Sequence, residues 1–214
     1  MSKTPILLVG AGGHARACID IIELEGRFAI SGLVDIREQV GARVFGYPVL
    51  GSDEDLPSLL VGHAHVLVAI GQIKTSEPRI RLFSLLERHN CEFPTIVSPR
   101  AYVSSHATVG AGTIVMHGAV VNAGATVGRN CILNSQCLVE HDAVIGDHCH
   151  ISTAAAVNSG VFVGSGTFVG SNACVRQGIK IGERCVIGMG QRVLADCEDG
   201  TMMPAAAAKG RAIR

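Results

Sequence analysis

Three ionisable residues, Glu140, His141 and Asp142, stand in succession in this 214-residue chain. An imidazole beside a carboxylate is the usual pair for general-base chemistry near pH 7, because the carboxylate orients the ring and stabilises its protonated form. A solvated turn that carries three charges is the structural alternative. The triplet therefore predicts either a catalytic base or an exposed corner.

A second candidate site is the glycine-rich stretch of residues 10–15, with Gly10, Gly12 and Gly13 followed by His14. Its G-x-G-x-x-A spacing lets a ligand approach the backbone closely, and a helix that begins there offers N–H groups and a positive dipole to a phosphate. Asp35 ends the next predicted strand, where a carboxylate can accept a hydrogen bond from a ribose hydroxyl. A nucleotide site is favoured over a tight turn that binds nothing.

The elements that position the triplet belong to a strict repeat. An aliphatic residue occupies every sixth position from Val97 to Val193, and most residues four positions after each anchor are small. A period of six belongs to neither a helix nor a two-faced strand and indicates a repeat architecture, here a parallel β-helix. Three six-residue rungs form an 18-residue coil, so Ser159 should stack about 4.8 Å from His141. Its backbone N–H is a candidate donor to an oxyanion.

The N-terminal part follows a different pattern, in which apolar segments alternate with helical ones. This alternation predicts a small parallel α/β domain. Strands are expected at residues 6–9, 30–34 and 66–70, and helices at 14–25 and 78–89. The chain is thus divided into an α/β nucleotide-sugar-binding domain, a β-helix domain and a C-terminal arm that leaves the helix, over residues 1–96, 97–196 and 197–214. Fewer than 100 residues precede the repeat, too few for the second mononucleotide-binding half that NAD requires.

The composition excludes several classes of partner. Lys and Arg total 18, as do Asp and Glu, and Trp is absent, so neither a basic surface nor an aromatic platform for nucleic acid is expected. No apolar run approaches the roughly 18 residues of a spanning helix, and no signal-peptide pattern opens the chain. We therefore expect a cytoplasmic protein without membrane insertion.

The eight cysteines lack any CxxC pair, and four of them, Cys131, Cys137, Cys149 and Cys185, occupy the small inward position of the repeat. Reduced cysteines that pack as compact apolar residues are expected. His148 and His150 lie close together, but the 18-residue spacing brings no third histidine to them, so no metal site is expected.

Several stretches together resemble the hexapeptide-repeat acyltransferases that modify sugars. The resemblance is to sialic acid O-acetyltransferase-like proteins and to N-acetyltransferases of nucleotide-linked 4-amino-4,6-dideoxy sugars, such as GDP-perosamine. These stretches are LVGAGGHA at residues 8–15, VAIG at 68–71, VEHD at 139–142 and HCHIS at 148–152. The resemblance implies a left-handed β-helix, a homotrimer, and acetyl-CoA bound as cosubstrate in the groove between neighbouring prisms.

The resemblance also implies roles for individual residues. His141 would be the general base and Asp142 its acidic partner. His150, Ser159 and Gly160 would lie on acetyl-CoA. The nucleotide sugar would contact a third set, Gly10, Gly12, Gly13, His14, Asp35 and Gly71.

Two departures from the family pattern affect these roles. Ser159-Gly160 stands where the family usually has two glycines, which weakens the case for the oxyanion donor. Met203-Pro204-Ala205, with Lys209 displaced, replaces the usual Gly-x-Pro-Ala-Lys ending, and this puts the contacts to the adenine end of CoA in doubt.

The favoured function is acetyl transfer to the 4-amino group of such a sugar, for surface polysaccharide such as lipopolysaccharide O antigen or for glycan synthesis. The sequence leaves UDP and GDP open. O-acetylation of a sialic acid-type sugar is the nearest alternative. An NAD(P)-dependent oxidoreductase would explain the glycine loop and Asp35 but would leave residues 140–142 without a role. A non-catalytic scaffolding trimer would explain only the repeat.

Overall fold

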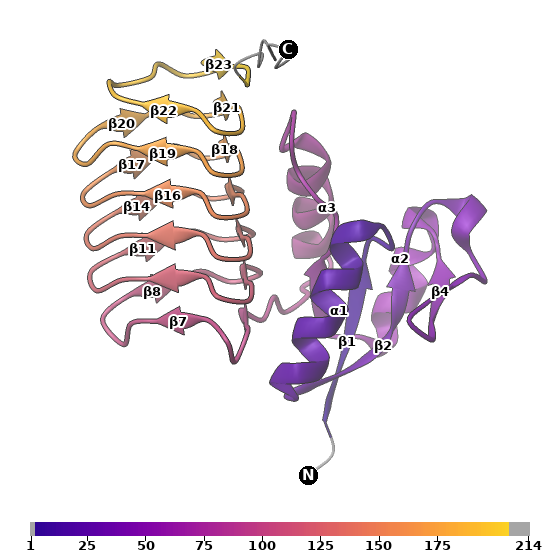
Figure 1. Ribbon diagram of the computed structural model, residues 1–214. Helices are drawn as coiled ribbons and strands as arrows, with labels where there is room; N and C mark the ends of the chain where they lie inside the picture. Colours follow the sequence, from indigo (N-terminus) through magenta and orange to yellow (C-terminus); the bar gives the residue numbers. More distant parts are fainter. Residues whose placement is uncertain (1–2, 206–214) are drawn as a thin grey trace, which may run out of the picture.

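The computed structural model describes residues 3–205. An α/β part is built on a five-stranded sheet of order β3-β4-β2-β1-β5, in which only β3 runs antiparallel to its neighbour (Figure 1). The strands are β1 Thr4–Val9, β2 Phe28–Val34, β3 Arg43–Val44, β4 Tyr47–Gly51 and β5 His65–Val68. The strands predicted from the apolar segments are thus confirmed, with bounds moved by at most two residues.

Both faces of β1, which lies between β2 and β5, are buried. Ile6 and Leu8 pack with α1 (Gly13–Glu25), and Leu7 and Val9 pack with α2 (Leu56–Leu59) and α3 (Glu77–Arg88). A parallel strand that is covered on both sides needs the continuous apolar run that the sequence has there. Three short 3-10 turns complete this part, η1 Arg37–Gln39, η2 Asp53–Asp55 and η3 Leu60–Gly62.

The repeat forms three parallel sheets, one on each side of a prism (Figure 1). Sheet 1 consists of β6 Ile96–Val97, β9 Ile114–Val115, β12 Ile132–Leu133, β15 His150–Ile151, β18 Phe168–Val169, β21 Val186–Ile187 and β23 Met202–Met203. Sheet 2 consists of β7 Tyr102–Val103, β10 Val120–Val121, β13 Leu138–Val139, β16 Ala156–Val157, β19 Cys174–Val175 and β22 Arg192–Val193. Sheet 3 consists of β8 Thr108–Val109, β11 Thr126–Val127, β14 Val144–Ile145, β17 Phe162–Val163 and β20 Lys180–Ile181.

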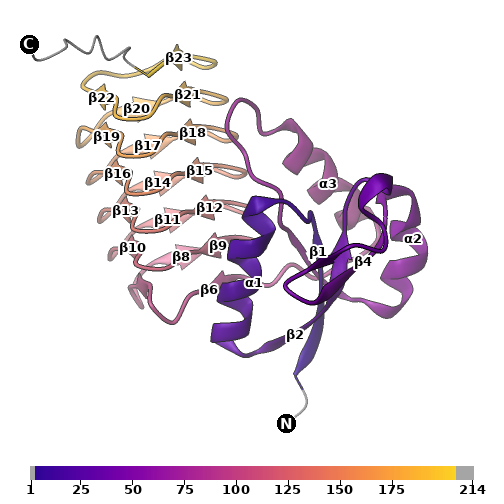
Figure 2. The same cartoon turned by 45° about the vertical axis from the view of Figure 1, so that its right-hand side comes forward.

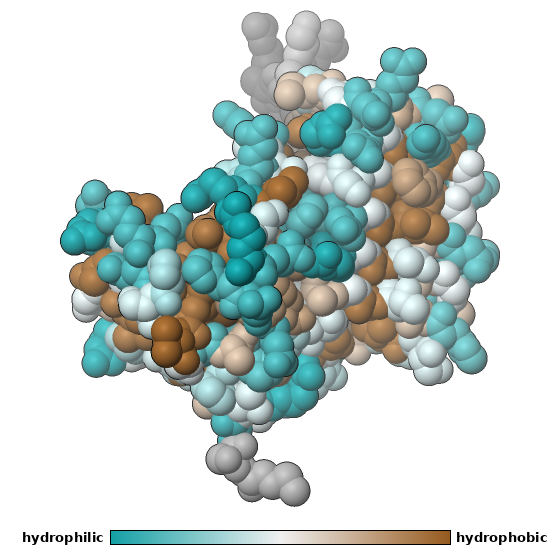
Figure 3. Space-filling model, turned by 180° about the vertical axis from the view of Figure 1, so that it is seen from behind, coloured by the Kyte–Doolittle hydropathy of each residue, from teal (hydrophilic) through white to brown (hydrophobic). Residues whose placement is uncertain are grey.

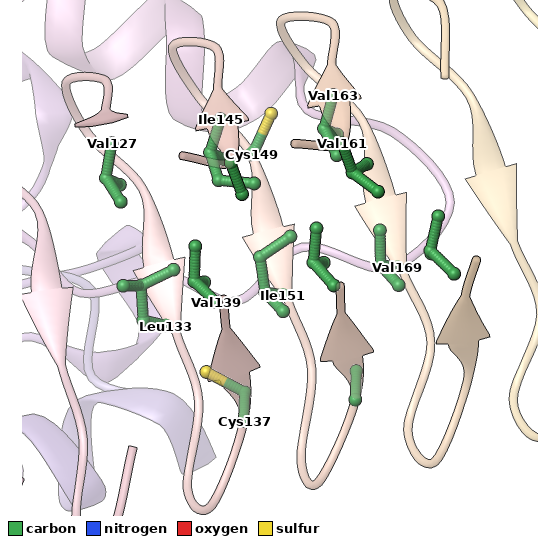
Figure 4. Close-up of a cluster of buried hydrophobic side chains, with 14 of the residues drawn as sticks. Val127, Leu133, Cys137, Val139, Ile145, Cys149, Ile151, Val161, Val163 and Val169 are labelled. Carbon is green, nitrogen blue, oxygen red and sulfur yellow. The ribbon is translucent and has the colours of Figure 1, made fainter. Parts of the chain in front are cut away.

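The predicted coil of 18 residues is confirmed by the strand register. Val121 pairs with Val139, Thr126 with Val144 and Ile132 with His150, so residues 18 apart are neighbours in all three sheets. Only the last coil is shorter, because Val186 pairs with Met202, 16 residues later. Each aliphatic anchor is the second residue of a two-residue strand and points into the prism, where successive coils stack their side chains (Figure 4). The regular six-residue period therefore becomes one continuous apolar core.

All eight cysteines are unpaired, and the four in the small inward position are buried in this core, as predicted. Among residues 3–205, no group of three or more His, Cys, Asp or Glu side chains converges as a metal site would require. Over the same residues, no helix has the length and apolar character needed to cross a bilayer.

The C-terminal segment differs in part from the predicted arm. Met202–Met203 forms β23 and pairs in parallel with β21, and the backbone of Cys197 forms an isolated parallel β-bridge with Ile181. The chain therefore continues the sheets of the repeat beyond residue 196. The rest of the predicted arm, residues 206–214, lies outside the described residues.

Sheet 1 carries the α/β part on its outer face (Figures 1 and 2). Ile114 and Ile132 of this sheet share a buried cluster with Cys18 and Ile22 of α1. His117 also lies at this contact, where its Nε2 is 2.7 Å from Asp20 Oδ2. The two parts of the chain are therefore joined by both apolar and polar contacts.

Candidate active site

His141 and Asp142 lie on the edge where sheet 2 turns into sheet 3, between β13 and β14. His141 Nδ1 is 2.9 Å from Asp142 Oδ2, and their side chains are 59 % and 73 % exposed. Asp142 has a φ of 60°, the left-handed conformation that turns the chain at this edge. One coil earlier stands Gly124, where a Cβ would collide with Asp142 Oδ1. The repeat thus leaves room for the carboxylate beside the ring.

The surroundings of His141 favour a base. Its hydrogen bond with Asp142 is the largest effect on its pKa and raises it, and the charges of Asp142 and Glu140 act in the same direction. The Glu140 carboxylate accepts hydrogen bonds from Asn122 Nδ2 at 2.9 Å and from the His141 backbone N–H at 3.1 Å. With Nδ1–H donating to Asp142, Nε2 carries the lone pair and can accept a proton from a substrate.

One coil later, the backbone amides of Ser159, the predicted donor, and Gly160 differ. The Gly160 N–H donates to His141 O at 3.1 Å and is used by the contact between coils. The Ser159 N–H has no hydrogen-bond partner among residues 3–205. Ser159 is thus the better donor for a ligand at this edge, although its contact with an oxyanion stays a prediction.

The glycine loop joins β1 to α1. Gly12 is the N-cap of α1 and no side chain caps the helix, so the N–H groups of the first turn remain available to an anion. Gly10 has a φ of 123°, and a Cβ there would lie 2.6 Å from Ile70 Cγ2. Around Gly12 and Gly13, in contrast, a Cβ would meet no atom within 4 Å. Gly10 is needed for the fold, and the other two leave open space.

Asp35 lies at the end of β2 and holds the glycine loop in place. Its carboxylate accepts hydrogen bonds from the Ala11 N–H and, at 2.8 Å, from the Ile36 N–H. It borders two cavities of about 160 Å³ and 240 Å³ at the carboxyl ends of the strands. Asp53 and Arg81 line the first, and Gly12 and Gln39 the second. Asp35 thus orders the loop and borders both cavities.

His14 points to a different place. It lines neither cavity beside Asp35, and its Nε2 is buried without a hydrogen-bond partner among the described residues. Burial lowers its pKa to about 3, and the charges of Arg79 and His150 act in the same direction. A Cβ at Gly71 would lie 3.7 Å from the His14 Cβ. His14 and Gly71 thus lie together, with a neutral imidazole turned toward the contact between the two parts of the chain.

His150 lies on β15 and is held by hydrogen bonds with two residues of other segments, Asn134 and Gln72. The amide oxygen of Asn134 accepts from the Ser135 N–H at 2.7 Å, so Asn134 Nδ2 is left to donate to His150 Nε2 at 3.1 Å. The Nδ1–H of His150 then donates to Gln72 O at 2.6 Å. Burial lowers the pKa of His150 to about 4, and the charge of Arg79 adds to this. His150 is therefore a neutral, oriented group and not a base near pH 7.

A largely apolar groove of about 830 Å³ opens beside His150 on sheet 1. Its polar groups are Asn134, Ser152 and Ser171, and Lys74 borders it from the α/β part. Met202, Met203, Pro204 and Ala205 line its other end, so the ending that departs from the family pattern forms part of this surface.

Comparisons with known proteins cover nearly the whole chain. Residues 5–82 match the family model of the PglD N-terminal domain, and residues 160–195 match the hexapeptide repeat of succinyl-transferase. One similar structure is perosamine N-acetyltransferase from Caulobacter crescentus, in a variant with one histidine replaced by asparagine and in complex with CoA and GDP-perosamine. It is 31% identical to this chain, with a TM-score of 0.89 over 98% of this chain and 99% of that one. The chain belongs to the hexapeptide-repeat sugar acetyltransferase family.

Two further acetyltransferase structures agree. PerB from Caulobacter crescentus, in complex with CoA and GDP-perosamine, is 32% identical over 94% of each chain, with a TM-score of 0.87. The acetyltransferase domain of PglB from Neisseria gonorrhoeae FA1090, in complex with acetyl coenzyme A, is 28% identical with a TM-score of 0.86, over 94% of this chain and 96% of that one. No protein of curated function gave a significant sequence match. The resemblance seen in the sequence is confirmed, and the chain is an acyltransferase.

The predicted site residues of this acetyltransferase fall into three groups. Gly10, Gly12 and Asp35 line the cavities at the strand ends of the α/β part, and Gly13 follows Gly12 as the first residue of α1. His14, Gly71 and His150 meet where that part contacts sheet 1. His141, Asp142, Ser159 and Gly160 lie on the edge between sheets 2 and 3. In a three-sided prism this edge is opposite sheet 1, so His141 and the groove beside His150 lie on different sides of one chain.

Sequence reasoning missed Gln72, Asn134 and Arg79. The first two are recognisable only from contacts between distant segments. Arg79 did leave a signal, because residues 79, 82, 83 and 86 have helical spacing and are the buried residues of α3.

Proposed function

We propose that this acetyltransferase transfers the acetyl group of acetyl-CoA to the 4-amino group of a nucleotide-linked 4-amino-4,6-dideoxy sugar, with GDP-perosamine as the first candidate. The observation that carries the proposal is the exposed imidazole of His141, which Asp142 orients on the repeat. The same chain has a glycine loop with free N–H groups that can bind a phosphate. Likeness over 98% of the chain to an enzyme structure with CoA and GDP-perosamine supports the choice of substrates.

The reaction uses His141 as the base. The neutral 4-amino group attacks the thioester carbonyl carbon, a C–N bond forms, and the carbonyl electrons move to oxygen, which accepts the Ser159 N–H. His141 Nε2 takes the proton from the new ammonium, and Asp142 stabilises the imidazolium. The C–S bond then breaks, and the CoA sulfur leaves and takes the proton from His141. The product is the N-acetylated sugar and CoA.

The nucleotide is held by the α/β part in this proposal. Its phosphates bind at the start of α1 beside Gly12 and Gly13, where the free N–H groups support anion binding. Asp35 lies between the two cavities and accepts a hydrogen bond from the nucleoside, since a carboxylate has acceptor sites beyond the two in use. His14 and Gly71 face the sugar.

Acetyl-CoA occupies the groove beside His150 in this proposal. The apolar walls suit the pantetheine chain, and the fixed amide of Asn134 and the ring of His150 lie where the acetyl end enters. Ser159 and Gly160 of a neighbouring chain complete the site, because within one chain they lie on the opposite edge of the prism.

We further propose a homotrimer in which the edge bearing His141 meets the groove of the next chain. Exposed apolar side chains on sheet 3, such as Val144 and Phe162, support an interface, and Figure 3 shows apolar groups among polar ones on this side of the repeat. Light scattering at micromolar concentration should give three times the chain mass of 22.3 kDa. A stable, fully active monomer would contradict the trimer.

The proposal also includes the domain boundaries and the left-handed sense of the β-helix. We place an α/β domain over residues 1–96 and a left-handed β-helix after it, as the family resemblance implies. The pairing of β23 with β21 favours an end of the β-helix after Met203 instead of residue 196.

The function is tested by turnover and by ligand binding. With GDP-perosamine and acetyl-CoA, we expect release of free thiol together with a sugar product heavier by one acetyl group. In thermal-shift titrations acetyl-CoA and GDP should raise Tm, because each binds the native state, and NAD should not. Acetylation of a sugar hydroxyl, or transfer to a free sugar but not to the nucleotide sugar, would overturn the proposal.

A further inference from the structure

Arg79 on α3 is a buried arginine that bonds to both parts of the chain. Its Nη1 donates to Val68 O at 2.9 Å and to Ile70 O at 2.5 Å, at the carboxyl end of β5. Its Nη2 donates to Asn130 O at 3.1 Å and to Asn130 Oδ1 at 2.6 Å, at the edge between sheets 3 and 1. We infer that Arg79 is a positioning residue that sets the register between the nucleotide-side turn, residues 68–72, and the groove on sheet 1.

Stability alone does not account for this arginine. Arg79 is 1 % exposed, its Nε has no hydrogen-bond partner, and none of the ion pairs within residues 3–205 includes it. Burying a charge without an opposite charge is costly, and an apolar residue of similar volume often gives an equally stable protein. The flat guanidinium does what an apolar side chain cannot, because its fork bonds to two separate backbone segments at fixed angles.

The segment that Arg79 holds is part of the substrate site. Ile70 packs against Gly10 of the glycine loop so closely that no Cβ fits there. Two residues later, Gln72 O accepts the hydrogen bond from His150 in the groove. The turn is therefore fixed to the glycine loop on one side and to the repeat on the other, and Arg79 links its residues Val68 and Ile70 to Asn130.

The register matters because the two substrates bind to different parts of the chain, as the proposed function requires. The α/β part holds the nucleotide and the groove holds the thioester, yet the amine and the carbonyl carbon must approach to about 3–3.5 Å. A displacement of about 1 Å can cost roughly 10²-fold in rate. Loss of Arg79 should then lower kcat while each ligand still binds its own part.

Two variants test this in the full-length enzyme. Arg79→Lys keeps the charge but loses the planar fork. Asn130→Gly removes the Oδ1 acceptor and keeps the left-handed backbone, whose φ is 51°. Both should lower kcat about 10- to 100-fold, with the Kd of GDP alone and of CoA alone changed less than twofold. Unchanged kcat, or a loss confined to GDP binding, would overturn the inference.

Arg129→Met is the matched control on the same contact surface. Arg129 pairs with Glu87 and lies 5.0 Å from the centre of the Phe83 ring, but it bonds to no atom of the turn. We expect kcat of this variant within twofold of the wild type. An equal loss in Arg129→Met and Arg79→Lys would mean that general packing, and not register, is at work.

Hydrogen exchange separates this inference from the proposed function. In Arg79→Lys the peptide covering residues 68–72 should exchange at least tenfold faster than in the wild type, and in Arg129→Met at the same rate. If the wild type transfers no acetyl group, the proposed function fails while the exchange result still decides the role of Arg79. Unchanged exchange in Arg79→Lys would show that the guanidinium does not hold the turn.

Discussion

The His141→Ala enzyme is expected to lose roughly 10²–10⁴-fold in kcat, with little change in the KM of either substrate. The ring takes a proton only as the amine attacks, so its loss removes an interaction made in the transition state. Steady-state kinetics with GDP-perosamine and acetyl-CoA measure this. A neutral amine is already a good nucleophile and could attack without a base. A loss below tenfold would therefore show that His141 is a binding residue and not the base.

The pH profile identifies the partner of His141. The base works in its neutral form, so activity falls as pH drops through the pKa of His141, which the contact with Asp142 raises. Asp142→Asn replaces the charged acceptor by a neutral amide and removes one negative charge, so the acid limb of kcat should move to lower pH while the maximum falls. His106→Ala is the matched control, since His106 is exposed on the same edge two coils earlier. It should leave both kcat and the pH profile unchanged.

Gly12→Ala is expected to weaken GDP binding at least tenfold without lowering Tm. Gly12 has a φ of −77°, which alanine adopts without strain, and its Cβ would meet no atom of the protein within 4 Å. Any loss must then come from a ligand that approaches the backbone closely. Calorimetry with GDP measures the affinity, and a tenfold loss corresponds to about 1.4 kcal/mol. Unchanged affinity would favour the alternative of a tight turn that binds nothing.

Gly10→Ala provides the opposite case in the same loop. Its φ of 123° and a Cβ 2.9 Å from the Ala69 backbone carbon mean that the protein itself excludes a side chain. We expect the free energy of unfolding to fall by about 1–3 kcal/mol, measured by denaturant titration. The two variants should therefore differ in what they lose. Gly10→Ala should lose stability, because the fold requires this glycine, and Gly12→Ala should lose GDP affinity, because the ligand requires it.

The repeat could be predicted because its information is local and periodic. An anchor at every sixth position sets which residue faces inward and which residues stack 18 apart, so the spacing alone makes Val121, Val139 and Val157 neighbours. The same regularity shows that residues 140–142 lie between the anchors Val139 and Ile145, at a turn of the coil. The contact of His141 with Asp142 followed from their adjacency in the chain.

Contacts between the two parts of the chain could not be predicted in this way. Arg79 and Asn130 are 51 residues apart, and His150 and Gln72 are 78 apart, with no period linking them. Helical spacing places position 79 on the buried stripe of α3, but it does not say which carbonyl groups lie opposite. Likewise, nothing local indicated that the Asp35 carboxylate would bond to the Ala11 N–H.

The 18-residue register also limits how a protein of this kind can change in length. Each coil contacts only its neighbours, so one complete coil can be added or removed with the remaining contacts preserved. An insertion of another length that is absorbed into the coils between residues 142 and 158, and not looped out at an edge, would turn every later residue toward a different side of the prism. Viable length differences among such chains should therefore be multiples of 18 or be confined to the loops at the edges.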